Sequence, residues 1–230
     1  MTNIDLTDQT AVVTGGTRGI GAAITRGLLA AGARVLATYH TGEDHARDFA
    51  AQLGQTPGGA GSRLSVHGFD VADPDAALAF FDALDGGLTI LVNNSGVRKD
   101  ALLGMMPHEA WQRVLSVNLT GAFNMCKHGV RAMMSARYGR IINVTSPSGR
   151  LGVAGQSNYA AAKAGLVGMT RSLAREVARR GITVNCVCPG FVLTDLIRDL
   201  PQDRLDQLRA EVPMARFGKP EEIAAAVLFL

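Results

Sequence analysis

The stretch Thr14-Gly15-Gly16-Thr17-Arg18-Gly19-Ile20-Gly21 stands between a short β-branched run and a helical pattern near the start of the chain. Its glycines follow a G-x-x-x-G-x-G spacing. A glycine-rich turn between a strand and a helix lets the backbone approach a pyrophosphate and aims the helix N-terminus at it. The stretch therefore predicts the first turn of a nucleotide-binding βαβ unit. Its candidate cofactor-binding residues are Gly15, Gly16, Thr17, Arg18, Gly19, Ile20 and Gly21.

Outward from this turn, short β-branched runs alternate with longer helical patterns along the chain, which predicts βαβ units and a parallel sheet. The expected strands are residues 10–14, 34–38, 64–69, 88–92, 140–145 and 183–188. We predict an α/β fold with one doubly wound Rossmann domain over residues 1–230 and the strand order 3-2-1-4-5-6. Asp73 and Pro74 are expected to begin a helix as N-cap and first-turn proline. Residues 107–135 are expected to form one long helix that is irregular near Asn118.

The composition is that of a soluble globular chain, with 47% hydrophobic residues, 19% charged residues and a net charge of +3. No lysine or arginine run is dense enough to indicate nucleic acid. The N-terminus is too polar for a signal peptide, and the longest apolar run, 223–230, is too short to span a membrane. Cys126, Cys186 and Cys188 lack the spacing of metal ligands, so no metal is expected. We predict a cytoplasmic protein with buried thiols.

Tyr159 and Lys163 lie four residues apart in an Ala-rich segment with helical spacing. On a helix they would occupy one face, one turn apart. A lysine ammonium within a few Å favours the phenolate, lowers the tyrosine pKa and makes the hydroxyl a usable general acid or base. The alternative is a pair of ordinary helix residues.

The end of the second expected strand, Ala37-Thr38-Tyr39-His40, carries no acid. An acid there usually holds the ribose 2′-hydroxyl of NAD. Glu43 and Asp44 follow, but they are expected in the first turn of the next helix, where its dipole favours them. Arg18 is placed to meet a 2′-phosphate and His40 could help, so NADP(H) is favoured. The alternative for Arg18 is a solvated loop cation.

Two further groups follow the third and fourth expected strands. Asp70 and Val71 end the third, and Asn94 and Gly96 follow the fourth. Nucleotides bind at the carboxyl ends of parallel strands in such folds, so these four residues are also candidate cofactor-binding residues. The alternative is that they only form turns.

Together these residues resemble the short-chain dehydrogenase/reductase family over essentially the whole chain. The segments RKDALLGMM at 98–106 and SLAREVARRGITVNCVCPGF at 172–191 are similar to those of bacterial 3-oxoacyl-acyl-carrier-protein reductases and their polyketide-pathway relatives. Two features depart from the family: Ser95 replaces the usual alanine, and the seventh strand is absent. The elements that carry the resemblance are the turn at 14–21, Asp70, NNSG at 93–96, Asn118, Ser146, Tyr159 with Lys163, and Pro189-Gly190.

The resemblance implies a catalytic role for each of four residues. Tyr159 would protonate a carbonyl oxygen, and Ser146 would hydrogen-bond the same oxygen. Lys163 would lower the tyrosine pKa and hold the nicotinamide ribose, while Asn118 would help to hold a water in a proton relay. It also implies that the nicotinamide end of the cofactor contacts Tyr159, Lys163, Pro189, Gly190, Val192 and Thr194.

These expectations favour NADPH-dependent reduction of a 3-oxoacyl thioester carried by acyl carrier protein. The alternatives are another carbonyl or alcohol substrate, such as an acyl-CoA, polyketide, sugar or steroid, and a non-catalytic sensor of NADP(H). Residues 193–214 are expected to form a substrate lid, or alternatively a plain surface helix.

Two further expectations concern partners. The resemblance implies that Arg137 and Arg180 dock an acidic carrier protein, although cations also suit helix C-termini for structural reasons. It also implies a homotetramer whose contacts include the helices at 107–135 and 158–180. A natural chain that continues beyond Leu230 is expected as well, and a truncated one should be at least a dimer.

Overall fold

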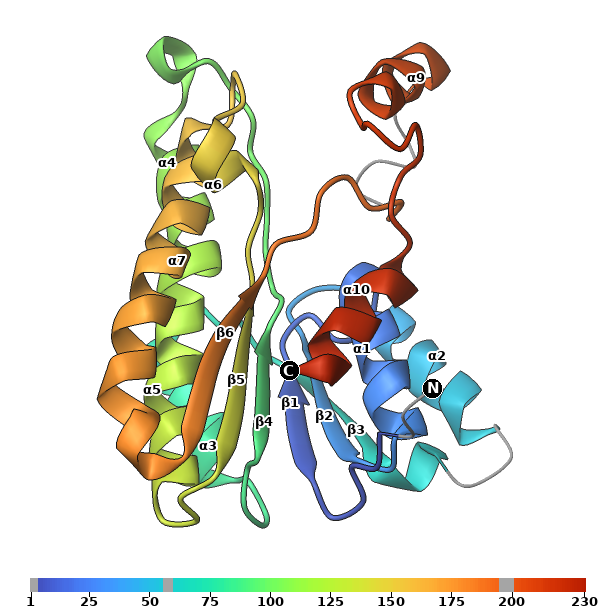
Figure 1. The fold of residues 1–230 in the computed structure, drawn as a ribbon, viewed down its shortest axis with the longest axis vertical. Helices are drawn as coiled ribbons and strands as arrows, with labels where there is room; N and C mark the ends of the chain where they lie inside the picture. The colour runs from blue at the N-terminus through green and yellow to red at the C-terminus, as the bar shows by residue number, and fades with distance from the viewer. Residues whose placement is uncertain (1–3, 56–59, 195–200) are drawn as a thin grey trace.

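Six parallel strands form the sheet in a computed structural model that describes residues 4–55, 60–194 and 201–230. The strand order is β3-β2-β1-β4-β5-β6, as the sequence predicts, and within the described residues β6 is an edge (Figure 1). The strands are β1 (Thr10–Val13), β2 (Arg34–Tyr39), β3 (Leu64–Gly68), β4 (Ile90–Asn93), β5 (Gly139–Val144) and β6 (Ile182–Val187).

Helices cover both faces of this sheet (Figure 1). The α-helices are α1 (Gly19–Ala30), α2 (Glu43–Gly54), α3 (Pro74–Asp82), α4 (His108–Leu115), α5 (Gly121–Met134), α6 (Ser148–Leu151), α7 (Ser157–Val177), α9 (Gln202–Ala210) and α10 (Pro220–Phe229). Shorter helical turns are η1 (Ala60–Arg63), η2 (Leu103–Met105), η4 (Ala178–Arg180) and the π-helical η3 (Ser116–Thr120).

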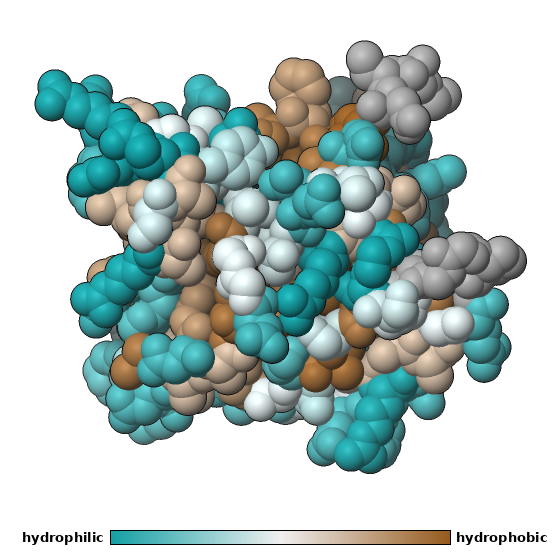
Figure 2. All heavy atoms as spheres, turned by 90° about the horizontal axis from the view of Figure 1, so that it is seen from below, coloured by the Kyte–Doolittle hydropathy of each residue, from teal (hydrophilic) through white to brown (hydrophobic). Residues whose placement is uncertain are grey.

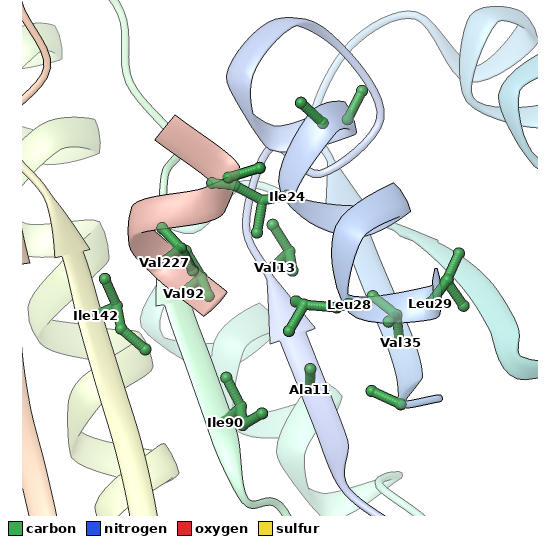
Figure 3. Packing of buried hydrophobic residues seen from close by; sticks show 14 of the residues in the cluster. Ala11, Val13, Ile24, Leu28, Leu29, Val35, Ile90, Val92, Ile142 and Val227 are labelled. Carbon is green, nitrogen blue, oxygen red and sulfur yellow. The ribbon is translucent and has the colours of Figure 1, made fainter. Parts of the chain in front are cut away.

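Alternating strand residues divide the core into two layers, because successive side chains of a strand point to opposite faces. Ala11 and Val13 of β1 belong to the cluster under α1 and α10. Figure 3 shows Ile24 and Val227 of those helices packed toward β1 and β4. Val12 belongs instead to the cluster under α3, α5 and α7. The central strands β1 and β4 are apolar on both faces, as expected for a parallel sheet covered on both sides.

Two local predictions are confirmed. Asp73 caps α3, since its carboxylate accepts hydrogen bonds from the amides of Asp75 (2.9 Å) and Ala76 (3.1 Å). The long helix is irregular at Asn118, because the π-helical η3 separates α4 from α5 there. A π turn inserts an extra residue and turns nearby side chains to new directions, and such turns often accompany functional sites.

The prediction of buried thiols is only partly right. Cys126 is buried and Cys186 is half-buried, but Cys188 is exposed. Cys188 follows the last residue of β6 and therefore lies beyond the packed part of the sheet.

The strands begin at the bottom of Figure 1 and end toward its top, where the loops of the candidate site gather. Figure 2 shows the opposite face from below, where hydrophilic side chains are interspersed with hydrophobic ones. Within the three described ranges, no helix combines the length and apolarity needed to cross a bilayer.

Candidate functional site

The glycine turn after β1 adopts backbone conformations and close contacts that favour glycine over residues with a side chain. Gly15 and Gly19 adopt positive φ angles of 61° and 51°. A Cβ atom on Gly21 would lie 2.0 Å from the carbonyl oxygen of Gly15. Because these glycines have no side chain, a pyrophosphate can approach the backbone closely at the start of α1.

The N-terminus of α1 is free of side-chain caps. Arg18 is the N-cap residue with an extended backbone (φ −144°), and no side chain accepts a hydrogen bond from the first turn. The amides of that turn and the helix dipole are therefore available to an anion. Exposed Arg18 also lines a surface pocket of about 230 Å³ together with Arg26 and His45. These features fit the phosphates of a dinucleotide.

Thr14 joins the glycine turn to the loop after β4, a role that the sequence reasoning missed. Its hydroxyl oxygen accepts hydrogen bonds from the backbone amides of Asn94 and Ser95, each at 3.0 Å. The amide group of Asn94 donates in return to the carbonyl oxygens of Thr14 (3.0 Å) and Gly15 (3.2 Å). In the sequence, this role could have been recognised from the threonine that directly precedes the first glycine of the turn.

The predicted cofactor residues that follow β3 and β6 lie at the same carboxyl edge of the sheet as the glycine turn, and Thr194 lies next to that turn. A Cβ on Gly19 would lie 3.4 Å from a methyl carbon of Thr194. Val71 is buried, and its carbonyl oxygen accepts a hydrogen bond from Asn124 at 2.9 Å. Pro189 and Val192 are buried near the end of β6, whereas Gly190 is exposed.

Asp70 carries an ion pair that sequence reasoning did not find. Its carboxylate accepts hydrogen bonds from the amide of Ala72 (3.0 Å) and the guanidinium of Arg113 in α4 (2.6 Å). The imidazole Nε2 of His40 lies 3.9 Å from the oxygen that Arg113 contacts. Burial is the largest single influence and raises the pKa of Asp70, but these two hydrogen bonds and the charges of Arg113 and His40 together hold the pKa below its usual value. Asp70 is therefore ionised at neutral pH.

The candidate catalytic residues meet where β5 and α7 approach each other. Ser146 follows β5 by two residues, and its hydroxyl lies near that of Tyr159 in α7, close enough to lower the tyrosine pKa. One turn along α7, Lys163 is buried at 4% exposure. Its ammonium donates a hydrogen bond of 2.8 Å to the carbonyl oxygen of Val144 and lies 5.6 Å from the centre of the Tyr159 ring.

The expectation that the pKa of Tyr159 lies below its usual value is not met. Burial raises the pKa of Tyr159 above its usual value, although the hydrogen bond with Ser146 and the charge of Arg98 act in the opposite direction. The lysine points at a backbone carbonyl rather than at the phenol. Burial also lowers the pKa of Lys163 to about 8. Tyr159 is thus a protonated acid at neutral pH beside a lysine that can lose its charge.

Asn118 anchors the loop after β4. Its side-chain oxygen accepts a hydrogen bond from the amide of Val97 (3.0 Å), and its amide group donates to the carbonyl oxygen of Val97 (2.8 Å). A Cβ on Gly96 would lie 2.6 Å from the same side-chain oxygen. The π turn therefore aims this side chain at the loop beside the candidate catalytic residues.

A chain of hydrogen-bonded polar side chains extends from Ser146. The sequence did not predict it. Ser146 donates to the hydroxyl of Ser148 (3.2 Å), which donates to Gln156 (3.3 Å). Gln156 donates to Asp100 (3.1 Å), and Asp100 pairs with Arg98. These contacts join the loops after β4 and β5. No short motif identifies them, because the partners come from separate loops.

The structure does not bring every predicted residue to this edge. Arg137 precedes β5 and Arg180 precedes β6, so both exposed arginines lie at the amino end of the sheet, opposite Tyr159. The guanidinium of Arg137 donates to the carbonyl oxygen of Arg179 at 2.9 Å. The expected lid at 193–214 contains α9, a polar helix whose buried residue is Leu208, and residues 195–200 lie outside the described part of the chain.

Nowhere in the described parts of the chain do three or more His, Cys, Asp or Glu side chains gather as a possible metal site.

Comparison with known proteins gives consistent matches. The model of the short chain dehydrogenase family matches residues 9–205. The 3-oxoacyl-acyl-carrier-protein reductase of Salmonella typhimurium is 47% identical over 220 residues, covering 96% of this chain and 88% of the relative. That of Vibrio cholerae is 45% identical over 230 residues, covering 99% and 91%. The acetoacetyl-CoA reductase of Shinella zoogloeoides is 42% identical over 226 residues, covering 96% and 90%.

Replacing Gly21 by alanine tests the geometry of the turn. Because the added Cβ would meet the carbonyl of Gly15 at 2.0 Å, backbone must move. We expect Gly21→Ala to destabilise the fold by about 1–3 kcal/mol in urea unfolding and to weaken binding of nicotinamide dinucleotides in calorimetry. Gly54→Ala is the matched control, since its Cβ meets nothing within 4 Å. Equal behaviour of the two variants would contradict the proposed close approach.

The pKa of Lys163 predicts an alkaline limit on turnover of a carbonyl substrate. The folded-state pKa is lowered to about 8, so the ammonium is lost as the pH rises through that value. If this charge supports the phenolate left on Tyr159 after proton donation, kcat for reduction should fall above pH ~8. Lys163→Arg keeps its charge and should move the limit upward. A wild-type kcat that stays constant well above that pH would contradict the role.

Proposed function

The chain belongs to the short-chain dehydrogenase family, and from that premise we propose that it reduces a 3-oxoacyl thioester to the 3-hydroxyacyl thioester with NADPH. The observation that carries the proposal is the contact of Ser146 with Tyr159 beside buried Lys163, at the strand ends that also hold the glycine turn. Family membership supports a nicotinamide cofactor for this site.

A bound nicotinamide would supply hydride to the substrate carbonyl carbon. The hydroxyls of Ser146 and Tyr159, which lie near each other, would turn to the carbonyl oxygen. Because burial raises its pKa, Tyr159 carries its proton at neutral pH and can give it to that oxygen. The Lys163 ammonium, 5.6 Å from the ring centre, would then favour the phenolate. Asn118 would hold the neighbouring loop, and we retain a water-holding role for it as part of the proposal.

NADPH is proposed over NADH on the arrangement around the glycine turn. Arg18 is exposed at the turn, where its guanidinium can form a charge-assisted bond to a 2′-phosphate. His40 directly follows β2 and is also exposed. Among the described residues, no hydrogen bond of either side chain has to break for it to reach a phosphate, although His40 lies 3.9 Å from Asp70.

Both classes of named relative act on 3-oxoacyl thioesters, as their names state, and differ in whether a carrier protein or coenzyme A holds the acyl group. We favour the carrier-bound substrate because the carrier-protein reductases reach 47% identity, against 42% for the acetoacetyl-CoA reductase of Shinella zoogloeoides. An acyl-CoA is the second candidate. We further propose a cytoplasmic homotetramer in which α9 closes over the substrate.

One substrate panel tests the reaction. The enzyme should oxidise NADPH with a 3-oxoacyl-acyl-carrier-protein and with acetoacetyl-CoA, but not with a sugar or steroid ketone. Tyr159→Phe should lower kcat at least about hundredfold, because the proton donor is lost while the ring still packs. Calorimetry should show unchanged NADPH binding for this variant. More than about a tenth of the wild-type turnover would contradict the assignment of Tyr159.

Docking of an acidic carrier protein by Arg137 and Arg180 is proposed separately. The length of β5 places both arginines about 20 Å from the carboxyl end of the sheet. A carrier protein bound to these arginines would therefore face away from Tyr159 of the same subunit. Reversing both charges, Arg137→Glu with Arg180→Glu, should raise KM for the carrier-bound substrate about tenfold or more and leave KM for acetoacetyl-CoA unchanged. An equal loss on both substrates would indicate damage to the fold and overturn docking.

A further inference from the structure

The hydroxyl group of Ser146 is held by its neighbour Ser148 through two hydrogen bonds. This hydroxyl donates to the side-chain oxygen of Ser148 at 3.2 Å and accepts a bond from the backbone amide of Ser148 at 3.3 Å. The donated bond is longer than the usual O–H···O distance of about 2.7–2.8 Å, so another acceptor can displace it. The same hydroxyl lies near that of Tyr159 and lowers the tyrosine pKa, so Ser148 and Tyr159 compete for the one proton of Ser146.

Asp100 and Gln156 decide in which direction the bond between the two serines runs. A carboxylate only accepts hydrogen bonds, so Asp100 draws the NH2 group of Gln156 toward it, at 3.1 Å. The side-chain oxygen of Gln156 therefore faces Ser148 and accepts the proton of its hydroxyl at 3.3 Å. With that proton used, Ser148 can only accept a bond from the hydroxyl of Ser146. The direction of the whole series is thus set by the acid at its end.

The two residues that set this direction are fixed between two loops. Asp100 is 39% exposed and pairs with Arg98, whereas Gln156 is buried at 8% exposure. Next to their contact, the backbone amide of Ala101 donates to the carbonyl oxygen of Gly155 at 2.9 Å. A substitution at position 100 or 156 therefore changes the side-chain hydrogen bonds while the backbone bond still joins the loops.

We infer that Asp100 and Gln156 are positioning residues for the proposed reaction: acting through Ser148, they fix the hydroxyl of Ser146 and keep its proton on a weak bond that the substrate carbonyl can replace. The inference rests on the role of Ser146 in the proposed function. Neither Asp100 nor Gln156 needs to touch the substrate or the cofactor.

The series stays satisfied when a substrate carbonyl takes the proton of Ser146. The amide of Ser148 still donates to the Ser146 oxygen, and the hydroxyl of Ser148 still donates to Gln156. If Gln156 did not accept that bond, the hydroxyl of Ser148 could turn and donate to Ser146. The proton of Ser146 would then turn to the nearby oxygen of Tyr159, and the substrate would have to displace a bond between the two catalytic hydroxyls.

Gln156→Leu tests this role, because it removes both side-chain bonds of Gln156 without changing a charge. We expect kcat for reduction of acetoacetyl-CoA by NADPH to fall about tenfold, since a small misplacement of a catalytic group is costly. KM for both compounds should change less than about threefold, because the lost bonds do not involve the residues that bind them. Asp100→Asn lets the amide of Gln156 turn over and should lower kcat about fivefold.

An exchange of the acid and the amide should rescue the activity. In Asp100→Asn with Gln156→Glu, the new amide at position 100 can donate to the new carboxylate at position 156. That carboxylate still accepts the proton of Ser148, so the direction of the series and the net charge are both kept. We expect kcat of this double variant to return to within about threefold of the wild-type value. A role in packing alone predicts no such recovery.

Ionisation of Tyr159 gives a second readout that needs no substrate. It is followed by the ultraviolet absorbance of the phenolate, with Tyr159→Phe as the blank. In Gln156→Leu the proton of Ser146 is free for Tyr159, and a bond donated to the phenolate favours the ionised form. The pKa of Tyr159 should therefore be lower in Gln156→Leu than in the wild-type protein.

Glu176→Gln is the matched control, because it replaces a carboxylate that accepts a hydrogen bond from Ser172 near the far end of α7. It should leave kcat and the pKa of Tyr159 unchanged. Thermal unfolding of each variant shows whether the fold persists. Asp100→Asn, at an exposed side chain, serves in place of Gln156→Leu if the latter does not fold.

Three results would overturn the inference: kcat of the single variants within about twofold of the wild-type value, no recovery in the double variant, or an unchanged pKa of Tyr159 in Gln156→Leu. A wild-type protein that reduces no 3-oxoacyl thioester would overturn the proposed function instead. The titration of Tyr159 would then still decide whether Gln156 controls the proton of Ser146.

Discussion

A single buried hydrogen bond, from the ammonium of Lys163 to the carbonyl of Val144, holds the candidate active site together. Burying an ammonium is costly unless it is paired, so this donor strongly restrains how α7 sits on the end of β5. The geometry of the catalytic side chains follows from that restraint. Ser146 lies two residues beyond Val144, and Tyr159 lies one turn before Lys163 on α7, so the two hydroxyls meet. The same burial lowers the lysine pKa to about 8, which ties the packing of the site to its response to pH.

A buried polar ladder connects this catalytic half to the nucleotide half. The amide of Asn93 in β4 donates to Asn143 in β5 at 2.8 Å, and Asn143 donates to Thr170 in α7 at 2.8 Å. Directly after Asn93, the amides of Asn94 and Ser95 donate to Thr14 before the glycine turn. A lost partner would leave a further buried polar group without compensation, since the side-chain oxygen of Asn93 already has no hydrogen-bond partner among the described residues. The reacting groups and the cofactor cradle are therefore held in one frame, which suits a reaction that transfers hydride and a proton to adjacent atoms.

Much of this could be predicted from the sequence, because the decisive patterns are local. β-Branched runs predict the strands, the glycine spacing predicts the turn at Gly15–Gly21, and Asp73 with Pro74 predicts the start of α3. The predictions that failed concern features that depend on contacts between residues far apart in the sequence. The direction of the Tyr159 pKa shift is set by burial and by the orientation of Lys163, neither of which spacing reveals. Arg113 reaches Asp70 from another helix, across 43 residues of sequence, so no local pattern reveals this ion pair.

Isotope transfer tests the central claim most directly, that this site moves hydride from a nicotinamide to carbon 3 of an oxoacyl thioester. The enzyme would be supplied with NADPH deuterated at both C4 positions of the nicotinamide and with acetoacetyl-CoA, and the product would be analysed by mass spectrometry. The account predicts one deuterium on carbon 3 of the 3-hydroxybutyryl product and none from solvent heavy water at that carbon. A product without this label, or labelled at carbon 3 from the solvent, would contradict hydride transfer at the site formed by Ser146 and Tyr159.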